Sequence, residues 1–221
     1  MFERYALFEI ENLTDRFSLQ EGVPKGVKKR YNISPTQTAP VIRSVDTHPI
    51  LEHMKWGLTP KDSKNMNSVF RYKTFSTQSE KAFSKPAWDD GVRNRRCIVP
   101  ANGFYQWRKK PTGKEPYFIS HPTQSLLGLA GIYSEWTDPE GVNWNTYSIL
   151  TIDEDSASVY GRLPVILHKD DEATWLNADT TDTSSLILLM RPYDGEPLVA
   201  HRVPDTVFST KIDNPTLITS A

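Results

Sequence analysis

Short apolar runs separated by proline, glycine and asparagine dominate the sequence. Runs of this length between turn-forming residues are typical of β-strands. The pattern predicts strands at 4–8, 39–44, 51–58, 97–99, 103–109, 117–120, 128–136, 145–152, 164–167 and 198–203. Because strands dominate, we predict an α+β fold built on a mainly antiparallel, barrel-like sheet with peripheral helices.

Three segments carry helical patterns instead, at 13–19, 77–88 and 169–176. Pro86 interrupts the second segment, and the third has acidic residues in its first turn, where they suit the positive end of the helix dipole. A chain of 221 residues fits one large domain or two small ones. Since no internal repeat or low-complexity tract divides the chain, we expect a single domain over residues 1–221.

Residues 95–107 form the most informative stretch, because they predict two short apolar strands around a Pro-Ala-Asn-Gly turn. The second strand places one polar side chain, Gln106, between the aromatic residues Tyr105 and Trp107. A polar group displayed in this way indicates that a ligand or another strand approaches it.

The formal net charge of −1 at pH 7 does not by itself indicate a nucleic-acid partner, but the charges are segregated along the chain. Residues 93–114 carry seven Lys or Arg and no acid, whereas residues 153–182 carry eight Asp or Glu against Arg162 and Lys169. Segregation of this kind is compatible with one positive face on a nearly neutral protein. The alternative is a solvated surface hairpin, which spacing alone favours.

Cys97 is the single cysteine, which excludes an intrachain disulfide and a cysteine-based zinc cluster. It lies in the apolar run 97–99, so we expect a buried thiol. The five histidines lack metal-ligand spacing, and the sequence has no phosphate-cradling glycine loop and no serine in a nucleophile-elbow pattern. We therefore expect no metal and no cofactor.

The N-terminus lacks a basic run followed by an apolar segment, and no stretch approaches the roughly 18 apolar residues of a membrane span. We expect a cytoplasmic protein, nuclear if its host is eukaryotic, without a membrane partner.

Four segments, in their order along the chain, are similar to the motifs of one family. They are residues 1–6 (Met-Phe-Glu-Arg-Tyr-Ala), 30–36 (Arg-Tyr-Asn-Ile-Ser-Pro-Thr), 95–107 and 161–167 (Gly-Arg-Leu-Pro-Val-Ile-Leu). Over essentially its whole length the chain resembles the SRAP domain, the family named for SOS response-associated peptidase. The resemblance implies the same barrel-like fold. It also implies binding to single-stranded DNA and covalent crosslinking to abasic sites through a cysteine at position 2.

In that family the initiator methionine is removed, so the cysteine offers a free amine and a thiol on one residue. The amine condenses with the aldehyde of the ring-opened abasic sugar, and the thiol closes the adduct to a thiazolidine. This chain has Phe2 at that position, and a phenyl ring is no nucleophile. We therefore do not expect crosslinking of the family's kind.

Four further positions of the family's motifs also depart from it here. The glutamate of its Gly-Phe/Trp-Tyr/Phe-Glu-Trp strand matches Gln106, whose amide has no titratable proton near neutral pH. The histidine two residues before an arginine matches Tyr160, whose reference pKa is about 10. In the Asn-Ala-Arg-x-Glu-Thr run, asparagine matches Val69, which cannot hydrogen-bond an abasic sugar, and glutamate matches Lys73. We predict that no catalytic set is intact.

Three arginines match family positions that hold phosphates: Arg4, Arg71 and Arg162. The fork of a guanidinium group suits bidentate phosphate contact, and single-stranded DNA binders combine such cations with aromatic stacking. The alternative is that each arginine pairs with a carboxylate near a strand end.

Three other positions match elements that contact bases in the family. Trp56 matches the Trp-Gly-Leu-x-Pro element as a stacking position, while Asn32 and Pro35 match the Tyr-Asn-x-x-Pro element, whose proline loop wedges against bases. The alternatives are a core role for Trp56 and a turn cap for Asn32.

Three hypotheses follow from these matches. The first is a catalytically degenerate SRAP-family monomer that binds single-stranded or junction DNA without a covalent bond. The second is an enzyme in which Tyr160, Gln106 or the Met1 amine supports a reversible Schiff base with an abasic site. The third is an interaction scaffold that kept the fold and lost DNA binding. Retention of three cationic positions favours the first.

Overall fold

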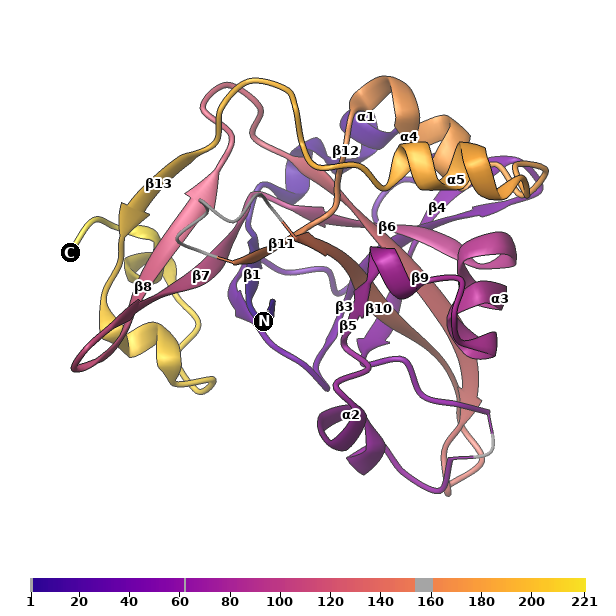
Figure 1. Ribbon diagram of the computed structural model, residues 1–221, viewed down its shortest axis with the longest axis horizontal. Helices are drawn as coiled ribbons and strands as arrows, with labels where there is room; N and C mark the ends of the chain where they lie inside the picture. The colour runs from indigo at the N-terminus through magenta and orange to yellow at the C-terminus, as the bar shows by residue number, and fades with distance from the viewer. Residues whose placement is uncertain (1, 62, 154–160) are drawn as a thin grey trace.

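The structure is a computed structural model that describes residues 2–61, 63–153 and 161–221 (Figure 1). The strands are β1 Tyr5–Leu7, β2 Arg30–Ile33, β3 Thr38–Val45, β4 His48–Trp56, β5 Ser76–Gln78, β6 Arg96–Ala101, β7 Gly103–Lys110, β8 Gly113–Ser120, β9 Leu127–Thr137, β10 Asn143–Asp153, β11 Arg162–Pro164, β12 Ile166–Leu167 and β13 Val199–Arg202. The α-helices are α1 Leu13–Phe17, α2 Asn67–Tyr72, α3 Pro86–Asn94, α4 Lys169–Leu176 and α5 Thr183–Leu189. Short 3₁₀ helices cover Ile10–Asn12, Ser79–Lys81, Asp205–Phe208 and Pro215–Ile218.

One sheet closes on itself to form a barrel. Strand β10 pairs with β4, β4 with β3, β3 with β6, β6 with β9, and β9 again with β10. Of these pairings β4–β10 is parallel and the others are antiparallel, while β5, β11 and β12 extend the sheet from β10 and β9. The predicted α+β class with a mainly antiparallel, barrel-like sheet is confirmed.

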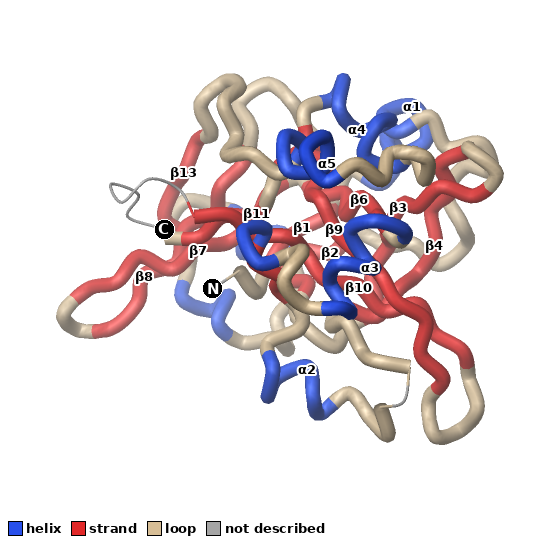
Figure 2. The backbone as a smooth tube through the Cα atoms, turned by 45° about the vertical axis from the view of Figure 1, so that its right-hand side comes forward, coloured by secondary structure: helices blue, strands red, loops and turns tan. Residues whose placement is uncertain are grey.

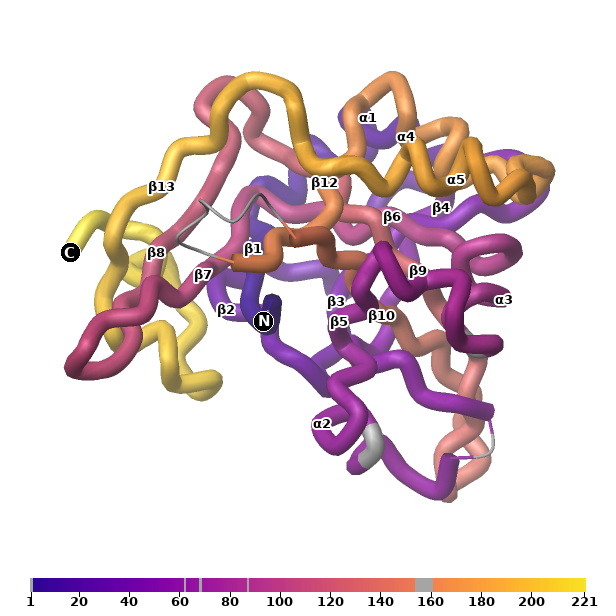
Figure 3. Tube along the Cα trace, in the orientation of Figure 1, coloured from indigo at the N-terminus to yellow at the C-terminus, as the bar shows by residue number. Residues whose placement is uncertain are grey.

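A second sheet, in the order β13-β8-β7-β1-β2, lies between two hydrophobic clusters. Side chains alternate between the two faces of a strand, and β1 follows this rule. Tyr5 and Leu7 belong to the large core inside the barrel, whereas Ala6 belongs to a smaller core with Tyr105 and Phe118. In Figure 3 the C-terminal segment, in yellow, lies beside β8 and covers this side of the sheet.

Helices lie around the barrel. In Figures 1 and 2, α1, α4 and α5 gather at the top, α3 lies along β9, and α2 lies at the opposite end, below the N-terminal segment. Among the described residues, no helix is long and apolar enough to cross a bilayer. The single-domain assignment stays a prediction.

The predicted helix at 77–88 is wrong. That stretch contains β5 and a 3₁₀ turn, and Pro86 begins α3 instead of interrupting a helix. Proline fits the first turn because its missing N–H has no partner there. The pattern also missed α2 and α5, whose short turns take their stability from packing. The prediction for Cys97 is confirmed: the thiol is fully buried, and burial raises its pKa.

Candidate nucleic-acid interface

The middle of β7 brings together two of the predicted segments. Strand β1 pairs with β7 through Tyr5 opposite Phe104, and the main-chain amide of Tyr105 donates to the carbonyl of Arg4 over 3.1 Å. The next residue, Gln106, is buried, and its side-chain amide donates to the main-chain carbonyl of Arg162 over 2.8 Å. Arg4 and Arg162, which are far apart in the sequence, are therefore hydrogen-bonded to two consecutive residues of β7, Tyr105 and Gln106. The sequence predicted that a ligand or another strand approaches Gln106. In the structure a strand does so, because Arg162 is the first residue of β11.

Phe2 lies in the core beside this meeting point. Its ring is fully buried, with centroid distances of 5.9 Å to Trp56 and 5.8 Å to Phe104. Trp56 is also fully buried: it stacks on Tyr147 at 6.1 Å, and its indole N–H donates to the carbonyl of Phe75. In this structure Trp56 has no exposed face on which a base could stack.

Two tyrosines, Tyr5 and Tyr147, pack against the ring of Trp56. The hydroxyls of Tyr5 and Tyr147 are 2.7 Å apart, and both side chains are fully buried. Burial raises the pKa of both tyrosines, so each remains a neutral phenol at ordinary pH. The described side chains at the centre of this region are therefore packed aromatic rings and a neutral hydrogen-bonded pair, and none of these is a nucleophilic anion.

Arg162 already has protein partners. Its guanidinium pairs with Glu80 at 2.5 Å and with Asp153 at 2.9 Å, and it also donates to the main-chain carbonyl of Thr151. Burial acts to raise the pKa of Glu80, but hydrogen bonds from Arg162 and the amide of Asp153 outweigh it and lower that pKa. A phosphate at Arg162 must compete with these two carboxylates.

Arg4 is half-buried and less completely paired. One terminal nitrogen donates to the carbonyl of Glu3 over 2.8 Å, whereas Nε is buried and has no hydrogen-bond partner among the described residues. Desolvation lowers the pKa of Arg4, partly offset by the charge of Glu3. The hydroxyl of Thr74, another position of the predicted motifs, is likewise buried without a partner in the described part of the chain. Such groups are uncommon and call for a ligand or water.

Arg71 lies on α2 with its side chain exposed. The helix is fixed to the barrel by Val69, which is fully buried against Gly57, where φ is +136°. A Cβ atom on Gly57 would lie 2.4 Å from Val69 Cγ1, so only glycine fits this close approach. Arg71 lies 5.4 Å from the ring centroid of Tyr72, and it forms no ion pair with any residue that the structure describes.

Asn32 and Pro35 are both buried. The side-chain amide of Asn32 donates to the carbonyls of Val207, Ser209 and Ile212 at 3.2, 2.9 and 2.9 Å. These bonds tie β2 to the C-terminal segment rather than capping a local turn. Tyr160, the last predicted site residue, lies outside the described residues.

Comparison with known proteins identifies the family. Residues 1–210 match the sequence model described as SOS response associated peptidase (SRAP). The chain belongs to the SRAP family. It is 32% identical over 225 residues to the abasic site processing protein YoqW of Bacillus subtilis, with both chains covered completely. It is also 31% identical to the abasic site processing protein HMCES of Gallus gallus, over 84% of this chain and 64% of that protein.

A solved structure gives the same result for the fold. The crystal structure of a Bacteroides thetaiotaomicron protein superposes with a TM-score of 0.86 and 26% sequence identity, covering 100% of both chains. The SRAP fold is therefore present from the first strand to the C-terminal segment.

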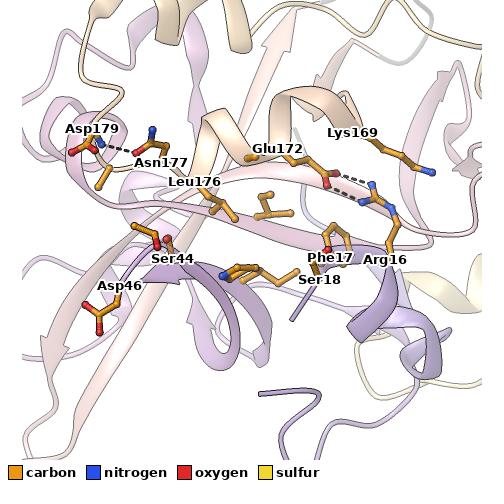
Figure 4. A pocket seen from close by; sticks show the side chains of 16 residues that line it. Arg16, Phe17, Ser18, Ser44, Asp46, Lys169, Glu172, Leu176, Asn177 and Asp179 are labelled. Carbon is orange, nitrogen blue, oxygen red and sulfur yellow. Dashed lines mark hydrogen bonds and ion pairs between the residues drawn. The ribbon is translucent and has the colours of Figure 1, made fainter. Parts of the chain in front are cut away.

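A cavity of about 800 Å³ lies between α1, α4 and the β3–β4 hairpin, and Ile98 of β6 also lines it (Figure 4). Its apolar lining includes Phe17, Ile42 and Leu176. At one end Arg16 forms two hydrogen bonds, of 2.8 and 2.7 Å, with Glu172. Burial raises the pKa of Glu172, although the charge of Arg16 opposes the shift. The described residues that line this cavity include none of the predicted site residues.

Sequence reasoning missed the partners of Arg162 and the surroundings of Arg71. Glu80 is 82 residues from Arg162, so no local pattern could join them. Phe70 and Tyr72 flank Arg71 directly, and both are exposed, at 59% and 63%. The sequence already contains this signal, because two aromatic residues stand directly beside a cation in the matched motif, and this pattern is typical of nucleic-acid binding.

Proposed function

We propose that this SRAP-family chain binds single-stranded DNA at abasic sites without forming a covalent bond to it. The observation that carries the non-covalent part is the position of Phe2, buried between Trp56 and Phe104. A thiazolidine requires an amine and a thiol on one residue, and a phenyl ring in that place supplies packing instead.

The substrate class comes from the relatives. YoqW and HMCES are named abasic site processing proteins, and YoqW matches this chain from end to end. We infer that abasic-site DNA is also the ligand here, in single-stranded or junction form.

Two other positions matched to the family's crosslinking pocket, Gln106 and Val69, support non-covalent binding over covalent chemistry. Gln106 uses its amide N–H to donate to the carbonyl of Arg162, and an amide neither accepts nor releases a proton near neutral pH. Val69 packs its methyl groups against Gly57 and has no polar group for a sugar hydroxyl. Both side chains make contacts within the fold, and neither can transfer a proton near neutral pH.

The three arginines differ in how fully they are paired with carboxylates, and this difference predicts how much each contributes to phosphate binding. Arg71 is exposed and unpaired among the described residues, so its charge is fully available. Arg4 keeps an unused buried Nε, whereas Arg162 is held by Glu80 and Asp153. We expect Arg71 to contribute most, Arg4 less and Arg162 least.

The test is a fluorescence-anisotropy titration with two single-stranded oligonucleotides that differ only in one abasic site. The proposal predicts saturable binding that weakens steeply with salt, and a lower Kd for the abasic strand. Absence of salt-sensitive binding to either strand contradicts the proposal and favours the scaffold hypothesis.

We further propose a monomeric, single-domain protein that is cytoplasmic, or nuclear in a eukaryotic host. Light scattering after size exclusion, with and without oligonucleotide, tests the oligomeric state. A molar mass of about twice that of one chain in either sample contradicts the monomer.

A further inference from the structure

Helix α2 displays two large aromatic side chains to solvent. Phe70 is 59% exposed and Tyr72 is 63% exposed, although the helix itself is well anchored. The two residues are two positions apart, so their rings leave the helix in different directions. Single exposed apolar residues are ordinary, but two exposed rings on a helix of six residues are a concentration of them. Val69 supplies the fully buried contact of α2, while the exposed ring of Phe70 lies 6.3 Å from the ring of the buried Phe75.

Positively charged residues alternate with these two rings along the sequence. Residues 63–79 contain Lys64, Arg71 and Lys73 and no acidic residue. Arg71 and Lys73 are exposed, and neither is ion-paired within the described part of the chain. Rings and cations that alternate along the sequence complement a chain of bases and phosphates, and they are the combination that single-stranded nucleic-acid binders use.

The helix is held firmly enough to present a fixed surface. On its N-terminal side, the indole N–H of Trp136 donates to the carbonyl of Ser63 over 2.7 Å. On its C-terminal side, the amide of Thr74 donates to the carbonyl of Val69, and the carbonyl of Thr74 accepts from Leu58. A helix whose backbone is already fixed loses little freedom when a base stacks on one of its rings.

We propose that α2 is a base-stacking platform, in which Phe70 and Tyr72 stack on unpaired bases while Arg71 and Lys73 hold the adjoining phosphates. The proposal rests on the proposed function of DNA binding and adds a binding surface to it. An abasic nucleotide has no base, so the stacked bases belong to its neighbours in the strand. In Figures 1 and 2, α2 lies below the N-terminal segment, so the proposal has the flanking nucleotides run from the Phe2 region towards α2.

The experiment compares two probes of equal length and charge. One is a mixed-sequence single-stranded oligonucleotide, and the other replaces every nucleoside with a tetrahydrofuran spacer, which keeps the phosphates and removes the bases. The proteins are wild type, Phe70→Ala/Tyr72→Ala and the conservative variant Tyr72→Phe. The control is Leu188→Ala, which truncates a similarly exposed apolar residue (66%) on α5. Thermal unfolding checks that every variant is folded.

We expect the double variant to raise Kd for the base-bearing strand by about 5- to 150-fold for each ring that stacks. Its Kd for the base-free strand should stay within about twofold of wild type, with the same salt slope, because the phosphate contacts remain. Tyr72→Phe and Leu188→Ala should bind like wild type, since the first keeps the ring and the second lies elsewhere.

The outcomes separate the platform from DNA binding itself. Wild-type binding with an unchanged double variant overturns the platform and leaves the proposed function standing. Equal loss on both probes also overturns it, because bases are then irrelevant. No wild-type binding to either probe overturns both proposals. If wild type is a dimer and the double variant is a monomer, the two rings serve self-association. This result also overturns the platform.

Discussion

The side-chain amide of Gln106 donates a 2.8 Å hydrogen bond to the main-chain carbonyl of Arg162. An ionised carboxylate at this position has no proton to donate and would face a carbonyl oxygen. The glutamine therefore joins β7 to the start of β11 in a way that the family's glutamate can reproduce only when protonated.

Gln106→Glu should destabilise the protein in a pH-dependent way. The new carboxyl is buried beside an acceptor, so its folded-state pKa is raised above its unfolded value. The bond is then retained below the unfolded pKa of about 4.3 and lost as the pH rises through the folded pKa. Urea unfolding should show a loss of about 1–3 kcal/mol at pH 7.5 and a smaller loss at pH 4.5.

The matched control is Gln20→Glu, because Gln20 is exposed. It should cost little at either pH. A Gln106→Glu variant as stable as wild type at pH 7.5 would show that the bond to Arg162 contributes nothing.

Phe2→Cys alone should not yield an efficient crosslinking protein. Processing of the initiator methionine would expose an amine and a thiol, but Gln106, Val69 and Tyr160 remain at the other family positions. On a denaturing gel with an abasic-site oligonucleotide, we expect the shifted band to stay a minor fraction of the protein.

The control is the combined variant Phe2→Cys/Val69→Asn/Gln106→Glu/Tyr160→His, which should give a larger shifted fraction. Stoichiometric crosslinking by the single variant would show that the other three positions matter little.

Arg71→Ala should weaken DNA binding without altering sequence preference. Its exposed guanidinium is unpaired among the described residues, so we expect it to contact one phosphate. The slope of log Kd against log salt should fall by about 0.7. All single-stranded sequences should lose affinity equally, because phosphates carry no base information. Lys169→Ala, on α4 at the opposite end of the molecule, is the control and should leave the slope unchanged.

Glu80→Gln should strengthen DNA binding. Glu80 pairs with Arg162 at 2.5 Å, so removing its charge leaves Asp153 as the one described carboxylate that competes with a phosphate for the guanidinium. Exposed ion pairs contribute little free energy, and the gain in affinity should reach at most about fivefold at low salt. Asp179→Asn makes the same charge change beside the cavity near α4 and serves as control. Equal gains in the two variants would assign the effect to net charge and not to Arg162.

The fold was predictable from the sequence because its strands alternate with clear turn residues, and the α+β barrel class is confirmed by the closed sheet. The sequence patterns that indicate helices were less reliable than those that indicate strands. The sequence predicts a break at Pro86, whereas Pro86 begins α3, because proline suits the first turn of a helix as well as it interrupts a helix interior.

The site was less predictable than the fold, since its partners are distant in sequence. Nothing near Arg162 indicates Glu80, and nothing near Asn32 indicates the three carbonyls of the C-terminal segment that it holds. Trp56 lies in a motif where stacking was predicted, yet in this structure it is enclosed by other rings. Side-chain type gave the chemistry at each position, and only tertiary packing could give its accessibility.

The most direct test of the central claim is intact-mass spectrometry of wild-type protein after overnight incubation with an abasic-site oligonucleotide, at a concentration where anisotropy shows saturation. The account predicts that the complex dissociates in denaturant and that the protein mass is unchanged. A species with the mass of protein plus oligonucleotide, formed by wild type, would contradict non-covalent binding.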